Sequence, residues 1–152
     1  MKKVLVSIFT IAMVLSWNHP AAGQGGSSLN DQLIQAAEKG DTAAVQQLLD
    51  KGANIEAKEK DGSTALIDAA AMGKTEVVRL LLAKGANIEA QSDYGRTALM
   101  YAATNGYPEV VKLLLEKGAN IDASNDGITV LSLAEKNDNP AAAELLRAHG
   151  AH

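Results

Sequence analysis

The sequence predicts an all-α protein, a solenoid of stacked helix-turn-helix units, and three observations support this fold class. The string KGANIEA begins at Lys51, recurs unchanged at Lys84 and returns as KGANIDA at Lys117, so each copy begins 33 residues after the last. A fixed period of this size is typical of stacked supersecondary units. The composition is 47% hydrophobic but only 3% aromatic, which predicts a core of Ala, Leu, Val and Ile that suits close-packed helices. Between the copies lie short apolar segments with helical spacing that end at glycine.

The first residues carry the pattern of a secretory signal peptide. Lys2 and Lys3 precede an apolar run over residues 4–15, and the small residues Ala21, Ala22 and Gly23 follow. The run is shorter than the ~20 apolar residues that a spanning helix needs. We therefore predict that residues 1–23 are a signal peptide cleaved after Gly23, with an uncleaved N-terminal anchor as the alternative.

Charge and cysteine content limit the partners of the mature chain. The sequence has no cysteine, which excludes disulfides and a lipid-modified cysteine after the signal peptide. Removal of Lys2 and Lys3 leaves 14 − 2 = 12 Lys and Arg against 18 Asp and Glu, a formal charge of −6. An acidic chain without a basic run predicts no binding to nucleic acid or to a membrane after cleavage. The short signal segment is typical of bacteria, so we expect a periplasmic or secreted protein.

The remaining chain divides into a linker and four units. Residues 24–28 contain too little apolar surface to pack and predict a flexible linker. Residues 29–152 form the array, with units at about 29–57, 58–90, 91–123 and 124–152. Asn30 or Asp31 is expected to N-cap a first helix that runs through Ala37, and Thr64 and Thr97 to N-cap the equivalent helices over 65–72 and 98–105. Second helices are expected over 42–50, 75–84 and 108–117.

The last unit departs from this pattern. Three residues separate Ala123 from Gly127, where earlier units have four, so its turn is one residue short. Asp138 stands where the other units have a glycine between their helices, and Asp can adopt the left-handed conformation that this corner needs. We interpret this unit as a C-terminal cap whose outer face, with Glu144 and Arg147, meets water.

The units resemble the ankyrin repeat. Each regular unit combines a Gly-x-Thr turn, a first helix with Ala-Ala, a glycine, a second helix with paired leucines, and Gly-Ala-Asn, and the resemblance covers about Leu29 to the C-terminus. It implies antiparallel helix pairs in a gently curved solenoid, with turns that project as β-hairpin-like fingers. The family's Thr-Pro-Leu-His becomes TALI at 64–67, TALM at 97–100 and TVLS at 129–132, so the Pro and His that stiffen the turn are absent.

The resemblance implies that a partner binds the finger tips and the exposed face of the first helices. Tyr94, Arg96 and Tyr101 are the candidate centre, because Tyr and Arg are enriched in binding hot spots. The alternative is that they merely cover a helical surface. We expect Ser63, Ser92 and Leu133 on the same face. The full set of candidate partner-binding residues is Lys58, Lys60, Asp61, Met72, Gln91, Asp93, Tyr94, Arg96, Tyr101, Asn105, Asp126 and Lys136.

The constant string KGANIEA is interpreted as structural. Its Gly ends the second helix, its Asn bends the connector and its Ile lies under the next unit. The residues that follow each copy differ, and these unlike finger tips are where recognition is expected.

Motifs for catalysis are not found. The chain has no Cys nucleophile, no Gly-x-Ser-x-Gly, no Walker-type phosphate loop and no His-Glu-x-x-His. His149 and His152 lie in the last residues, where further metal ligands are not fixed. We expect no catalytic residue, no metal and no cofactor.

The leading interpretation is a non-catalytic protein–protein interaction module of the bacterial cell envelope, monomeric, that binds a folded partner through its finger tips and concave face. Some exported bacterial ankyrin proteins that resemble this chain are associated with protecting or activating partner enzymes, including oxidative-stress enzymes. An alternative is a secreted bacterial factor that engages a host protein. An enzyme is the third hypothesis.

Overall fold

The computed structural model describes residues 28–152. The predicted signal peptide and its cleavage site, and residues 24–27 of the predicted linker, lie outside the described residues. Within these residues eight helices form four pairs: α2 (Leu29–Lys39) with α3 (Thr42–Asp50), α4 (Ala65–Ala71) with α5 (Thr75–Ala83), α6 (Ala98–Asn105) with α7 (Pro108–Glu116), and α8 (Val130–Lys136) with α9 (Pro140–Ala148).

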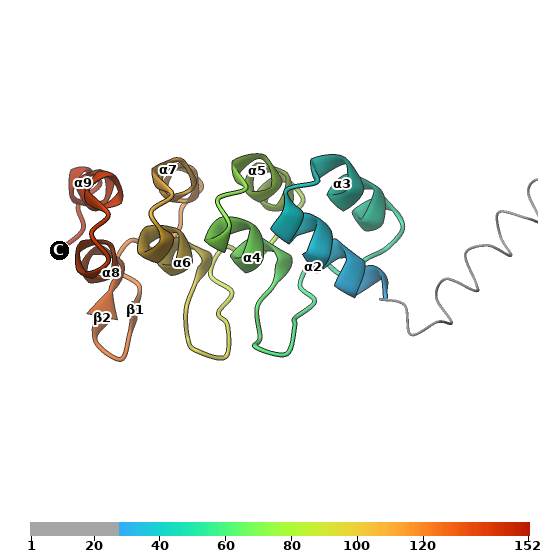
Figure 1. Cartoon of the computed structure of the whole chain (residues 1–152), viewed down its shortest axis with the longest axis horizontal. Helices are drawn as coiled ribbons and strands as arrows, with labels where there is room; N and C mark the ends of the chain where they lie inside the picture. The colour runs from blue at the N-terminus through green and yellow to red at the C-terminus, as the bar shows by residue number, and fades with distance from the viewer. Residues whose placement is uncertain (1–27) are drawn as a thin grey trace, which may run out of the picture.

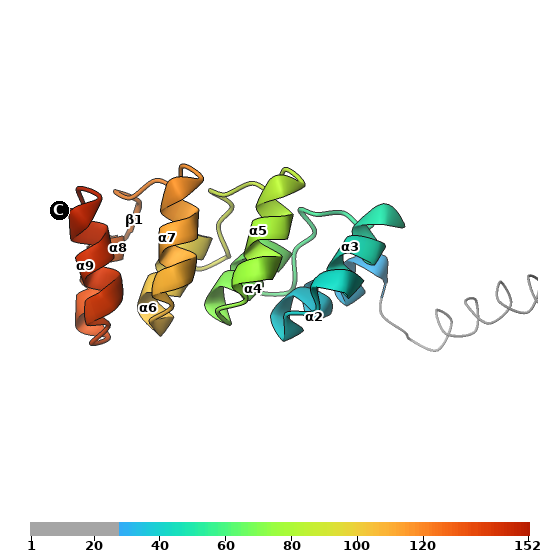
Figure 2. The same cartoon turned by 90° about the horizontal axis from the view of Figure 1, so that it is seen from above.

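The pairs stack into a solenoid of two helical layers. The first helices α2, α4, α6 and α8 form one layer and the second helices form the other, with loops that project below the first layer (Figure 1). Each first helix packs on the next first helix and on its own second helix. Seen from above, the four pairs lie side by side in a single row (Figure 2). The predicted all-α solenoid is confirmed.

Threonine caps set the starts of three first helices. The Thr64 hydroxyl accepts a hydrogen bond from the Ile67 N–H, and Thr97 and Thr129 cap α6 and α8 in the same way. The Thr64 and Thr97 caps were predicted and are confirmed. Because such a side chain satisfies an N–H that the helix leaves without an intrahelical partner, a short helix can begin there without Pro.

The first helix begins earlier than the sequence predicts. Ser28, rather than Asn30 or Asp31, is the N-cap of α2. The Asp31 N–H donates to the Ser28 hydroxyl at 3.2 Å, and the Ser28 N–H donates to the Asp31 carboxylate at 3.1 Å. This capping box satisfies two N–H groups at once, so Ser28 belongs to the array and not to the linker.

The shortened turn of the last unit forms a tight hairpin. Strands β1 (Ser124–Asn125) and β2 (Ile128–Thr129) pair antiparallel, and between them Asp126 and Gly127 have φ values of 50° and 78°. Two left-handed residues are what a two-residue hairpin turn of type I′ requires. Asp138 has φ 57°, so it replaces the inter-helix glycine as predicted.

Small residues let the first helices approach one another. Ala69, Ala70, Ala102 and Ala103 are fully buried. Leu, Val and Ile side chains and Met100 fill most of the rest of the core, whereas the predicted core residues Leu49, Leu80, Leu82 and Leu115 are only partly buried. In residues 28–152, every helix is shorter or less apolar than a membrane crossing requires.

Candidate functional site

Three fingers project from the first-helix layer (Figure 1). We call residues 58–64 finger 2, residues 91–97 finger 3 and residues 124–129 finger 4. Finger 2 is closed by backbone bonds from the Glu59 N–H to the Ser63 carbonyl at 2.9 Å and from the Gly62 N–H back to Glu59 at 3.0 Å. In finger 3 the Ser92 N–H donates to the Arg96 carbonyl at 3.0 Å, and the Gly95 N–H donates to the Ser92 carbonyl at 2.9 Å. The fingers therefore close through their backbones, without the family's Pro and His.

The fingers are also bonded to one another. The Asp93 N–H donates to the Asp61 carbonyl at 2.8 Å, and the Lys58 ammonium donates to the Gln91 carbonyl at 3.2 Å. The Asn125 side-chain amide donates to the Tyr94 carbonyl, which joins finger 4 to finger 3. These bonds fix neighbouring fingers relative to each other, so the finger surface is largely formed before a partner arrives.

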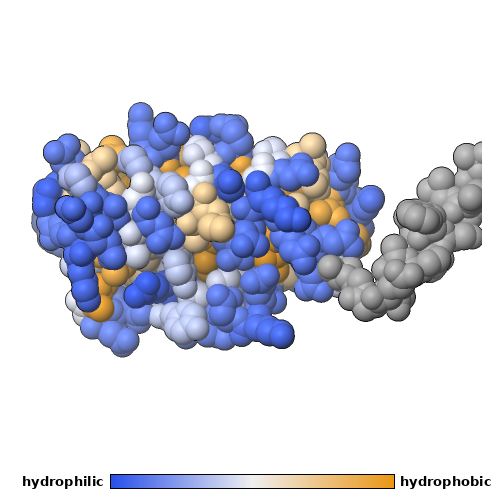
Figure 3. Space-filling view, viewed as in Figure 1, coloured by the Kyte–Doolittle hydropathy of each residue, from blue (hydrophilic) through white to orange (hydrophobic). Residues whose placement is uncertain are grey.

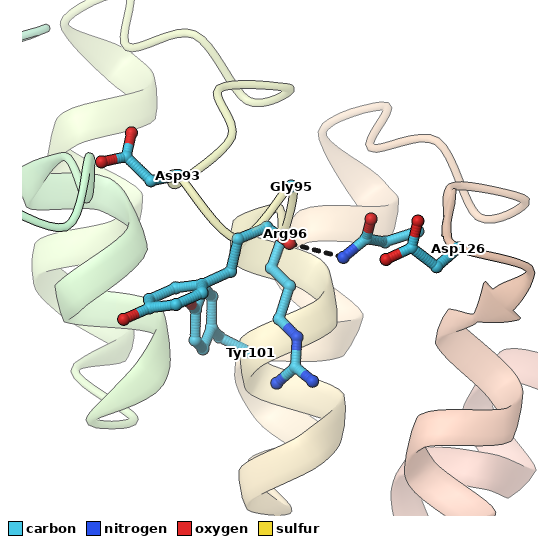
Figure 4. Close-up of a pocket in the computed structure, with 7 residues that line it drawn as sticks. Asp93, Gly95, Arg96, Tyr101 and Asp126 are labelled. Atoms are coloured by element: carbon cyan, nitrogen blue, oxygen red, sulfur yellow. Dashed lines mark hydrogen bonds between the residues drawn. The ribbon is translucent and has the colours of Figure 1, made fainter.

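A cleft of about 770 Å³ lies between fingers 3 and 4 (Figure 4). Tyr94, at 65% exposed, is the most exposed large hydrophobic side chain in the described part of the chain. The Arg96 guanidinium carbon lies 6.0 Å from the centre of the Tyr101 ring, within range of a cation–π contact. The cleft thus brings together five of the predicted residues; its full lining is Asp93, Tyr94, Gly95, Arg96, Tyr101, Asn125 and Asp126.

The charged groups of this cleft point in different directions. Figure 4 shows Arg96 extending along α6 beside Tyr101, whereas the Asp93 carboxylate is turned away from Arg96 and Asp126 lies across the cleft on finger 4. No ion pair joins Arg96 to a carboxylate within residues 28–152. A guanidinium over one tyrosine ring, in a cleft that a second tyrosine also lines, is suited to stacking and hydrogen bonding with a protein surface.

Three residues expected on the binding face are buried, and the expectation is wrong for them. Ser63 and Ser92 are 2% and 5% exposed, and Leu133 is 4% exposed. Ser92 turns inward because its hydroxyl lies 3.1 Å from the Tyr101 hydroxyl and accepts from the Tyr94 N–H at 3.3 Å. Leu133 packs in the core cluster, where an apolar side chain is removed from water. Tyr101 is consequently half-buried and partly structural.

The remaining candidate residues lie at the surface but are spread over several units. Lys60 and Asp61 line a second cleft, of about 530 Å³, together with Asp31 and Glu59. Met72 is 45% exposed at the end of α4. The Asn105 amide donates to the Ala71 carbonyl at 2.8 Å, so it also joins two units. Gln91 and Lys136 are exposed and lie outside both clefts.

Carboxylates concentrate around finger 2 and α4. Burial, together with the negative charges of Glu59, Asp61 and Glu38, raises the pKa of Asp68 to about 7. Burial also raises the pKa of Glu59, with added repulsion from Asp61, Glu38 and Asp31. The family resemblance implies that Asp68 and Glu59 lie on the binding face, but the sequence carries no signal that the packing of α2 brings Glu38 toward them. The described residues contain no group of three or more His, Cys, Asp or Glu arranged to hold a metal ion.

Stacked helix pairs with projecting, mutually bonded fingers define a repeat protein of the kind that presents a binding surface. The family model for ankyrin repeats, three copies, matches residues 33–125 and 91–152. The chain belongs to the ankyrin repeat family, as the resemblance implied. Ankyrin repeats are generally protein–protein interaction modules and typically not enzymes. No curated protein matches the chain.

Proposed function

We propose that this protein is a non-catalytic binding module of the bacterial cell envelope that binds a folded protein through its finger tips and the concave face formed by the first helices. The cleft between fingers 3 and 4 carries this proposal, because it combines the exposed Tyr94 with Arg96 over the Tyr101 ring. Bonds between the fingers hold this surface in place. A surface that is ordered in advance loses less conformational entropy on binding.

The extent of the surface supports a partner of ordinary size. The finger face spans fingers 2, 3 and 4, and a standard interface needs ~800 Å² per partner. The large apolar side chains exposed on residues 28–152 are Leu29, Met72, Tyr94 and Ile128, which come from separate units. Figure 3 shows a face that is mostly hydrophilic, with small separate apolar patches. This distribution favours a monomer that binds a partner over an obligate dimer.

The cellular setting rests on the first 23 residues. Lys2 and Lys3, the apolar run over 4–15 and the small residues ending at Gly23 support export to the periplasm. A partner enzyme there, such as an oxidative-stress enzyme, follows from the resemblance to exported ankyrin proteins. Mass spectrometry of the mature N-terminus, with separate analysis of osmotic-shock fluid and culture supernatant, tests this. Protein found only in the supernatant would favour the secreted, host-directed alternative, and a chain that starts at Met1 in the exported fraction would remove the export proposal.

Site-specific crosslinking tests the binding face. A photoreactive phenylalanine placed at Tyr94 in the full chain is expected to crosslink one exported protein, which peptide sequencing identifies. The matched control carries the same group at Lys112, which is exposed on the second-helix layer. Equal crosslinking from both positions would contradict a specific surface on the fingers.

A further inference from the structure

Finger 3 carries a positive charge at a position where the other two fingers carry none. Arg96 immediately precedes the threonine that caps α6. The equivalent residues are Ser63, which is buried before the cap of α4, and Ile128, which precedes the cap of α8. A cation at this point of the finger face therefore occurs once in the array and is not part of the repeat pattern.

The surroundings of Arg96 hold its guanidinium in place. Its carbonyl accepts from the Ser92 N–H at 3.0 Å, and its guanidinium carbon lies 6.0 Å from the centre of the Tyr101 ring. The Tyr101 hydroxyl lies 3.1 Å from the hydroxyl of the buried Ser92, so the ring is itself fixed. A stacked guanidinium uses its face for the ring, and the N–H groups in its plane remain available to an acceptor.

The two carboxylates that line the same cleft are held away from Arg96. The Asp93 carboxylate lies over Gly62 of finger 2, where an added Cβ would collide with it, and the Asp93 N–H donates to the Asp61 carbonyl at 2.8 Å. Asp126 lies across the cleft, in the left-handed turn of finger 4 (Figure 4). Among residues 28–152 no carboxylate forms an ion pair with Arg96. The cleft therefore holds an ordered cation that lacks a counter-charge.

We propose that the Arg96 guanidinium binds the carboxylate of a single acidic side chain, presented by a loop of the partner protein. The planar guanidinium donates two parallel hydrogen bonds to a carboxylate, which is among the stronger polar contacts in proteins. The cleft, at about 770 Å³, is in the size range of sites that enclose a small ligand, so it accommodates the tip of a loop. This inference rests on the proposed binding function and names the chemistry of that partner.

The rim of the cleft restricts the residues beside the acidic one. Asp93 and Asp126 line the cleft on fingers 3 and 4, and the chain has a formal net charge of −4. A cluster of acids on the partner would be repelled by these charges, whereas one acid between neutral or basic neighbours would not. Tyr94, which is 65% exposed, offers a ring to the apolar part of the same loop. The expected ligand is thus a lone acidic residue in a loop that is otherwise neutral or basic.

An NMR titration of the full chain with short peptides, blocked at both ends, tests this inference. The probe is Gly-Lys-Glu-Lys-Gly, and the signal is the side-chain N–H resonance of Arg96. The same peptide with Gln in place of Glu is expected to bind about tenfold more weakly, because a neutral amide forms weaker bonds with a guanidinium. Gly-Glu-Glu-Glu-Gly should also bind more weakly than the probe. Equal binding of the Glu and Gln peptides, or no shift of the Arg96 signal with the probe, would overturn the proposal.

A further peptide distinguishes a side chain from a chain terminus as the source of the carboxylate. This peptide, Gly-Lys-Gly-Lys-Gly, has a free C-terminus and no glutamate. It is expected to bind more weakly than the probe. Tighter binding of this peptide would overturn the assignment of the cleft to an acidic side chain.

Substitutions in the chain locate the contact. Arg96→Lys keeps the charge without the planar fork and should weaken binding of the probe about fivefold. Arg96→Gln should remove the discrimination between the Glu and Gln peptides. Lys60→Gln removes a cation from finger 2 instead and is the matched control, expected to stay within about twofold of the parent chain. Circular dichroism checks that each variant is helical. An equal loss of discrimination in Lys60→Gln would contradict a contact at Arg96.

Failure of this inference is distinguishable from failure of the proposed function. The peptide titration uses this chain alone, whereas the binding function is tested by crosslinking from Tyr94. With a crosslinked partner identified, Arg96→Glu should weaken its binding, and replacement of the contacting acid of the partner with Arg should restore it. Undiminished binding by Arg96→Glu would overturn the proposed contact and leave the protein a binding module.

Discussion

The Glu56 carboxylate accepts a hydrogen bond from the backbone N–H of Asn87, at 2.8 Å, across the boundary between two units. Glu89 does the same for Asn120 at 2.9 Å. Each glutamate belongs to one copy of the KGANIEA string and reaches the asparagine of the next copy. The last copy carries Asp122 in place of glutamate, and no further copy of the string follows it. The string therefore contains a clamp between units.

Removal of the clamp should destabilise the array. Glu56→Ala or Glu89→Ala is expected to lower the free energy of unfolding by about 1–2 kcal/mol, because a backbone N–H loses a charged acceptor. Urea denaturation followed by circular dichroism measures the change. Asp122→Ala is the matched control and should stay within about 0.5 kcal/mol of the parent chain. If Asp122→Ala lowered the free energy of unfolding as much as the glutamate variants do, the acidic side chain would act within its own unit and not through a bond to the next unit.

Local features of this fold could be predicted from sequence. Thr64 caps a helix through its own hydroxyl and Gly40 ends one with φ 79°, so each signal lies within a few residues of its effect. The bond between Glu56 and Asn87 joins residues 31 apart, and only the stacking of units brings them together. The sequence therefore predicted that the string is structural, but it gave no role to the glutamate, because the residue that this glutamate contacts lies in another unit.

The candidate site likewise combines features that the sequence predicted with contacts that it did not predict. The resemblance to the ankyrin repeat implied that Tyr94, Arg96 and Tyr101 lie on one surface, and the cleft contains all three. Spacing did not predict that Ser92 turns inward to the Tyr101 hydroxyl. A periodic pattern indicates the face on which a side chain lies, but the neighbour that it meets there depends on how loops and helices pack.

Glycine substitutions should separate backbone strain from contact between fingers. Gly62 has φ 77°, and a Cβ there would lie 2.6 Å from the Asp93 nitrogen, which bonds the Asp61 carbonyl. Gly52 has φ 98° and open space around it. Gly52→Ala should cost about 1 kcal/mol from left-handed strain alone, whereas Gly62→Ala should cost about 3 kcal/mol because finger 3 must also move. Denaturation curves that give the same loss for both would contradict the contact between fingers.

The stability of the folded chain should depend on Asp68 and pH. Because the pKa of Asp68 rises from an ordinary value of 3.8 to about 7, the folded chain binds more protons than the unfolded chain between these values. The Asp68 contribution to the free energy of unfolding therefore falls as the pH rises from about 4 to about 7, and the full penalty is present above that range. Solvent screening reduces the penalty to about 1–2 kcal/mol.

Asp68→Asn isolates this contribution. Urea denaturation at pH steps should show that the variant loses less stability than the parent chain as the pH rises. The gap between the two proteins should widen between about pH 4 and about pH 7 and stay constant above that range. Parallel curves for the two proteins would show that Asp68 is not the titrating group.

Substitutions at the two tyrosines of the cleft should affect partner binding and folding stability differently. Tyr94 is 65% exposed, so Tyr94→Ala is expected to leave the free energy of unfolding within about 0.5 kcal/mol of the parent. The same substitution should weaken binding of the crosslinked partner more than tenfold.

Tyr101→Phe removes the hydroxyl that meets Ser92 but keeps the ring under Arg96. It should cost about 1 kcal/mol of stability and leave affinity within about threefold. Calorimetric titration against the partner gives both affinities, and circular dichroism checks the helices. Undiminished binding by a fully helical Tyr94→Ala variant would place the recognition surface elsewhere on the fingers.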